Sequence, residues 1–101
     1  MKNVDWDDLR LFLAVARAGG LSAAATELGA SPATLSRRML ALERSLGRPL
    51  FLRRQTGYSL TPYGEQFQAV ARKMEAGARS VEAWLAAEER PPVVRISAGP
   101  W

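Results

Sequence analysis

Arginine is the residue of this sequence with the clearest chemical capacity, and the arginines are concentrated in one block. Residues 31–60 contain six arginines and a single glutamate, whereas residues 1–30 and 61–90 each carry one more acidic than basic group. A guanidinium can form paired hydrogen bonds with a phosphate or with the edge of a guanine base. A solvated basic face is the alternative, but solubility does not require concentration in one segment. The distribution therefore favours a polyanionic partner.

The residue types that most enzymes and metal sites need are scarce. The chain of 101 residues contains no cysteine and no histidine, which removes thiolate chemistry, the commonest general base and the commonest metal ligand. Its carboxylates are scattered along the sequence. No apolar run is long enough to cross a bilayer, and the N-terminal residues MKNVDWDD are acidic where a signal peptide is basic. We expect one compact cytoplasmic domain that is not an enzyme and holds neither metal nor cofactor.

The segment SPATLSRRMLALERSLG, residues 31–47, predicts a helix that is buried on one face and free on the other. Ser31 is a favourable N-cap, Pro32 suits the first helical position, and Gly47 ends the helix. Arg37 and Arg44 lie opposite one narrow apolar sector of the helical wheel. The sector consists of Leu35, Met39, Leu42 and Leu46.

The free face of this helix is suited to a groove of DNA. It begins with the small residues Ala33 and Thr34, which allow close approach, and the free N–H groups and dipole of a helix N-terminus favour phosphate. Arg37 follows one turn later and can bond a guanine edge. Leu40 also lies toward the free face, where it would either pack on the preceding helix or touch a thymine methyl group.

Two helices are predicted before this one. Asp5 caps the first, which ends at Gly19-Gly20. Ser22 is expected to cap the second, a short alanine-rich helix over residues 23–28. A short helix, a turn that contains glycine and a capped basic helix form a helix-turn-helix arrangement.

A small hairpin and a long helix are predicted after the basic helix. Residues 50–52 and 58–60 are short extended pieces around a glycine-containing turn, which places Arg53 and Arg54 near the tip. There they would meet phosphate rather than bases. Thr61 caps a fourth helix that continues to about residue 89.

The long helix carries a heptad pattern that predicts pairing with a second helix. The domain core can reach only its first turns, so the far end requires another partner. A second copy of the chain is favoured over a further domain of the same chain. The predicted dimerisation residues are Phe67, Ala71, Met74, Ala78, Val81 and Leu85.

The run GLSAAATELGASPATLSRRMLALERSLGRPLFLRR, with the later YSLTPYG, resembles the N-terminal DNA-binding domain of LysR-type transcriptional regulators. The resemblance covers roughly residues 4–65. It implies a mainly α fold, a winged helix-turn-helix of three helices and a two-stranded wing followed by a long linker helix. The domains expected are the winged helix-turn-helix at 4–61, with its motif at about 20–39, and the dimerisation helix at 62–90. Residues 91–101 would be a hinge and the start of an effector-binding domain that this sequence lacks.

The resemblance also implies partners and site residues. It implies sequence-specific binding of double-stranded promoter DNA by a homodimer or tetramer, with a small-molecule effector bound only through the missing C-terminal domain. Contacts with DNA carry over to Ser22, Pro32, Ala33, Thr34, Ser36, Arg37 and Arg53. Ser31, Arg38 and Arg54 complete the predicted DNA-binding set.

Two departures from the family pattern concern specificity. Pro32-Ala33 stands where many members have Gln-Pro, so a base-reading glutamine is absent, and Thr56 stands where many have a second wing arginine. A MarR-like winged-helix protein or a binder of DNA without sequence preference are the alternatives. A MarR-like protein usually has additional helices before the helix that contacts the bases, which here is the basic helix at residues 31–47. A binder without sequence preference does not require an Arg37 that faces bases.

Overall fold

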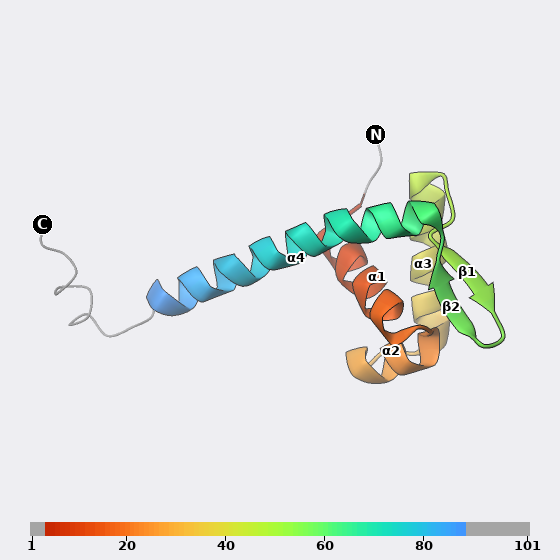
Figure 1. Cartoon of the computed structure of the whole chain (residues 1–101). Coiled ribbons are helices and arrows are strands. Elements are labelled where there is room, and N and C mark those ends of the chain that lie inside the picture. Colours follow the sequence, from red (N-terminus) through yellow and green to blue (C-terminus); the bar gives the residue numbers. More distant parts are fainter. Residues whose placement is uncertain (1–3, 89–101) are drawn as a thin grey trace, which may run out of the picture.

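The computed structural model describes residues 4–88, and the predicted hinge at 91–101 and the last two residues of the predicted long helix lie outside them. Four helices and one antiparallel hairpin make up the described part (Figure 1). In chain order the elements are α1 (Trp6–Ala18), α2 (Leu21–Leu28), α3 (Pro32–Leu46), β1 (Phe51–Arg54), β2 (Gly57–Leu60) and α4 (Pro62–Glu88). The predicted fold, mainly α with a two-stranded wing, is confirmed.

Most of the helix ends follow from local capping chemistry. The Asp5 carboxylate accepts from the backbone N–H of Asp8 at 3.0 Å, and the Ser31 hydroxyl accepts from that of Thr34 at 3.1 Å. Gly19 and Gly47 end α1 and α3 in the left-handed conformation, with φ of 76° and 81°. The left-handed backbone conformation favours glycine, because glycine has no Cβ atom to clash there.

The start of α2 differs from the prediction. The helix begins at Leu21, and its N-cap, Gly20, has no side chain that could cap it. Ser22 therefore lies within the first turn rather than before it, and its carbonyl oxygen accepts from the Thr26 hydroxyl at 3.2 Å. The predicted cap at Ser22 is wrong because the helix starts two residues earlier than the sequence pattern indicated.

The core joins α1 to every other layer of the domain. Phe12 is fully buried. The centroid of its ring lies 5.3 Å from the ring centroid of Phe51 on β1 and 5.0 Å from that of Phe67 on α4. Leu35 and Met39 bury the predicted stripe of α3 against this cluster. Burial of this apolar area supplies most of the drive to fold.

The hairpin is fixed at both of its ends. β1 pairs with β2 from Phe51–Leu60 to Arg54–Gly57. At its base, the Thr61 N–H donates to the Leu50 carbonyl at 2.9 Å, and the Thr61 hydroxyl accepts from Gly64 N–H at 2.9 Å to cap α4. At its tip, the Tyr58 N–H donates to the Gly19 carbonyl at 2.8 Å. The wing is thus tied to the turn between α1 and α2.

Helix α4 leaves the domain and extends beyond it (Figure 1). An ion pair joins this helix to α1. Arg17 of α1 donates two hydrogen bonds to the Glu75 carboxylate of α4, one of them 3.0 Å long. These bonds hold the pKa of Glu75 below its ordinary value. The pair therefore stabilises the fold at neutral pH, and this contribution is lost as the pH falls through the lowered pKa.

The two serines at the starts of helices give a matched test of capping. Ser31→Ala should lower the free energy of unfolding by about 1 kcal/mol, because the hydroxyl caps an orphan N–H of α3. Ser22→Ala should change it by less than about 0.5 kcal/mol, since this exposed hydroxyl caps nothing. Chemical denaturation measures both, and equal losses would contradict this assignment of caps.

Candidate nucleic-acid interface

The N-terminal half of α3 presents an uncovered face. Pro32, Ala33 and Arg37 are exposed, and Thr34 and Ser36 are half-buried. The Thr34 hydroxyl oxygen accepts from the Ser31 hydroxyl at 2.8 Å and from an Arg37 Nη at 3.4 Å. Within residues 4–88 Arg37 forms no ion pair, so its guanidinium keeps most of its donors for a ligand.

Arg38 is held differently from its neighbour. Its Nη2 donates to Asp7 at 2.9 Å and to Asp8 at 3.0 Å, which joins α3 to the first turn of α1. Hydrogen bonds from Arg10 and Arg38 lower the pKa of Asp7. Arg38 therefore has a clear role within the domain, and a phosphate would have to share its guanidinium with two carboxylates.

The two arginines of the wing also differ. Arg53 bonds the Glu43 carboxylate, with Nη2 at 2.8 Å and Nη1 at 3.3 Å, and its guanidinium lies 5.3 Å from the Tyr58 ring centroid. Arg54 is exposed beside the tip of the hairpin and forms no ion pair within the described residues. Arg54 is thus the free cation of the wing.

The tip of the wing and the start of α2 face each other across an open cleft. Its walls are Ala18, Gly19, Gly20, Leu21, Ser22 and Ala23 on one side and Arg54, Gln55, Thr56, Gly57 and Tyr58 on the other. The uncapped start of α2 contributes free N–H groups to this cleft. The structure thereby places Ser22 and Arg54, far apart in the sequence, at the same edge of the domain.

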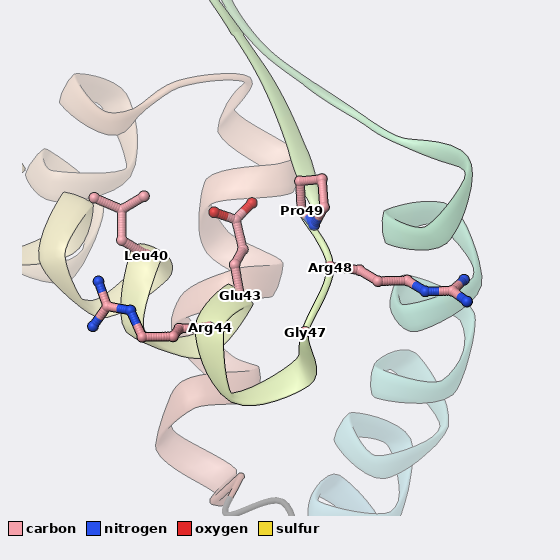
Figure 2. A pocket seen from close by; sticks show the side chains of 6 residues that line it. All are labelled: Leu40, Glu43, Arg44, Gly47, Arg48 and Pro49. Atoms are coloured by element: carbon pink, nitrogen blue, oxygen red, sulfur yellow. The ribbon is translucent and has the colours of Figure 1, made fainter.

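A second, shallow hollow lies along the C-terminal half of α3, where it is lined by Leu40, Glu43, Arg44, Gly47, Arg48 and Pro49 (Figure 2). Leu40 is 44% exposed and lies beside Arg44 in Figure 2, so its side chain is available at the surface. Arg48 extends away from the hollow in this view, and its guanidinium lies 5.2 Å from the ring centroid of Tyr63.

Three of the six predicted dimerisation residues, Met74, Val81 and Leu85, are exposed, and the other three are buried or half-buried. Phe67 packs on Phe12 and Ala71 is fully buried, so both belong to the core of the single chain. Ala78 is half-buried. The exposed large apolar residues of α4 are Val70, Met74, Val81, Trp84 and Leu85.

The exposed apolar face of α4 therefore differs in part from the predicted seam. Val70 and Trp84 belong to this face, although they are not among the predicted dimerisation residues. The spacings from Val70 through Met74, Gly77 and Val81 to Trp84 are 4, 3, 4 and 3, which is itself a heptad pattern. The sequence of α4 therefore contains two heptad patterns. Only the packing of α1 against α4 decides which of the two patterns stays exposed.

Neither a metal-ligand cluster nor a membrane-spanning helix is present among residues 4–88. No group of three or more acidic residues in this part of the chain could hold a metal ion. No helix within the same range combines the length and the apolar character needed to cross a membrane.

Comparisons with known proteins agree with this geometry. The family model described as "Bacterial regulatory helix-turn-helix protein, lysR family" matches residues 6–65. The HTH-type transcriptional regulator TfdS of Cupriavidus pinatubonensis is 41% identical over 80 residues, which are 78% of this chain and 27% of TfdS. The small neutral protease regulatory protein of Streptomyces coelicolor is 42% identical over 66 residues, 65% of this chain and 20% of that protein. The chain thus spans less than a third of either relative.

Solved structures give the same result. The CbnR_DBD–DNA complex superposes with a TM-score of 0.74 at 38% identity, and the match covers 85% of this chain and 100% of that one. CbnR is described as a LysR family transcriptional regulator. The similar domain in that crystal structure is thus bound to DNA.

Proposed function

The chain belongs to the LysR family of bacterial regulatory helix-turn-helix proteins, and from this we propose that it binds specific sequences of double-stranded promoter DNA as a homodimer. The winged helix-turn-helix at residues 4–61 would contact DNA, and the helix at 62–90 would link two copies. The family match replaces the MarR-like alternative. The proposed activity is cytoplasmic, requires no cofactor and is not enzymatic.

The observation that carries the proposal is the exposed Arg37 guanidinium in the N-terminal half of α3, which forms no ion pair with residues 4–88. This helix is buried on its opposite face by Leu35 and Met39, so it is held rigidly while Arg37 remains exposed. A helix fits the major groove of DNA, where arginine can bond guanine with two hydrogen bonds. We propose that Arg37 reads a base edge while Pro32, Ala33, Thr34 and Ser36 lie against the groove.

Phosphate contacts would orient α3 in the groove. We propose that Ser22 and the free N–H groups at the start of α2 bind one backbone segment, and that Ser31 and Arg54 bind others. Arg38 and Arg53 can join them only by sharing their guanidinium groups with Asp7, Asp8 or Glu43. We therefore assign the larger part of the phosphate attraction to Arg54.

Pairing of two chains through α4 would bring two reading helices to one DNA duplex. The exposed face that contains Val70, Met74, Val81 and Trp84 is apolar, and residues 4–88 do not cover it. Exposed apolar patches of this kind commonly mark an interface between proteins. Two related half-sites, separated by about one turn of DNA or a multiple of it, are then expected in the target.

Removal of the wing cation tests the proposed phosphate contact. Arg54→Ala should weaken binding to all duplexes about equally and lower the magnitude of the slope of log K against log salt by about one. Fluorescence anisotropy with labelled duplexes at several salt concentrations measures both quantities. Arg72→Ala, which removes an exposed arginine from α4, is the matched control and should leave the slope unchanged. A normal slope for Arg54→Ala would place the wing outside the interface.

A further inference from the structure

Glu43 is a buried carboxylate that the proposed DNA contacts do not use. It is 8% exposed and lies in the C-terminal half of α3, on the buried side of the helix. One of its oxygens, Oε2, accepts from the backbone N–H groups of Leu50 at 2.7 Å and Phe51 at 3.1 Å. A buried charge is costly unless it is fully bonded, so these contacts hold the start of β1 firmly against α3.

The same carboxylate also binds the wing through Arg53. The guanidinium Nη2 lies 2.8 Å from Oε1, and the guanidinium also faces the Tyr58 ring on β2. One side chain of the reading helix therefore holds the base of the wing through two backbone N–H groups and its middle through one arginine. Thr61 and Gly19 provide separate backbone contacts to the hairpin, so the wing does not depend on Glu43 alone for its existence.

The position of this carboxylate couples the two parts of the proposed interface. Arg37 and Glu43 lie on the same helix, whereas Arg54 follows Arg53 directly on the wing. A phosphate contact by Arg54 and a base contact by Arg37 must be made to one duplex at the same time. The angle between α3 and the wing decides whether both can form, and Glu43 joins the two elements, because it belongs to α3 and its carboxylate bonds Leu50 and Arg53.

We propose that Glu43 is a positioning residue for DNA binding. It holds the wing at the angle to α3 that lets both reach one duplex, and it neutralises Arg53 so that this arginine acts as a brace rather than as a charge on phosphate. The inference rests on the proposed function. Glu43 itself does not touch DNA.

The test compares Glu43→Gln, Arg53→Gln and the double variant with the wild-type chain. Glutamine has nearly the size of glutamate and keeps an oxygen acceptor, but it offers no charge to Arg53. The probe is a pool of short duplexes of random sequence, and affinity is measured over a range of salt concentrations. Thermal unfolding fixes a temperature at which every variant is folded. Glu82→Gln, a change of an exposed glutamate on α4, is the control.

Each single variant should lose roughly fivefold or more in affinity, and the double variant should be no weaker than the weaker single variant, because both residues act as one unit. In Arg53→Gln and in the double variant the salt slope should stay within about half a unit of the wild-type slope, in contrast to Arg54→Ala. A slope lowered by about one in Arg53→Gln, or wild-type affinity in Glu43→Gln, would overturn the inference. Absence of wild-type binding would instead overturn the proposed function, and this inference with it.

Discussion

Two aspartates on the exposed face of α4 are expected to separate the dimer and to weaken DNA binding by about a hundredfold or more. The variant is Val81→Asp with Trp84→Asp. Two linked DNA-binding modules gain roughly 10² to 10⁴ in apparent affinity over one module when both can engage, and separation of the chains removes that gain. The winged helix-turn-helix should stay folded, because neither residue contributes to its core.

The exposure of this face supports it as the site of the proposed partner. Val81 is 55% and Trp84 62% exposed, and both lie beyond Glu75, which joins α4 to α1 through its ion pair with Arg17. Gly77 lies within the same stripe and would allow a second helix to approach closely. Charges placed at this seam would have to be buried without partners, and that is strongly unfavourable.

Analytical ultracentrifugation at rising protein concentration measures the association. The wild-type chain should sediment as a dimer and the double variant as a monomer. Ala76→Asp with Ala83→Asp adds the same charge to exposed positions on another face of the helix and should leave the dimer intact. A wild-type chain that stays monomeric at high concentration, both free and with DNA, would contradict the proposed dimer.

The second large effect is expected at Arg37. Arg37→Ala should cost roughly 1–3 kcal/mol on the preferred site and much less on random DNA, because a base contact contributes only where the correct base is present. The substitution should leave stability nearly unchanged, since the side chain is exposed and forms no ion pair in residues 4–88.

Competition titrations measure this difference. Unlabelled preferred and random duplexes compete for the variant and for the wild-type chain at one salt concentration, and the ratio of the two affinities gives specificity. Arg72→Ala removes an equal charge from an exposed position on α4 and should preserve that ratio. Equal losses on both duplexes for Arg37→Ala would mean that Arg37 binds phosphate only.

The elements were predictable because their boundaries are local. Asp5, Ser31 and Thr61 provide cap hydroxyl or carboxylate groups, and Gly19 and Gly47 provide left-handed ends, so five helix boundaries follow from neighbouring residues alone. The apolar stripe of α3 and the hairpin are similarly short-range patterns. The start of α2 was missed because a glycine N-cap has no side chain to mark it.

The roles of individual charged residues were not predictable, because they depend on contacts between distant segments. Arg37 and Arg38 are neighbours in the sequence, yet only Arg38 meets the carboxylates of α1. Likewise Arg53 meets Glu43, whereas Arg54 forms no ion pair with residues 4–88. The exposed apolar face of α4 differs from the predicted dimerisation residues for the same reason: contact with Phe12 takes Phe67 into the core, and no pattern within α4 reveals that contact.

The central claim is that this chain reads a DNA sequence as a dimer, and selection from a pool of random duplexes tests it most directly. Several rounds of binding by the wild-type chain, followed by sequencing, should enrich two related half-sites in inverted orientation. Their centres should be separated by about one turn of DNA, roughly 10 base pairs, or by a multiple of it. Retention of the pool without enrichment of any sequence would contradict the claim and indicate a binder without sequence preference.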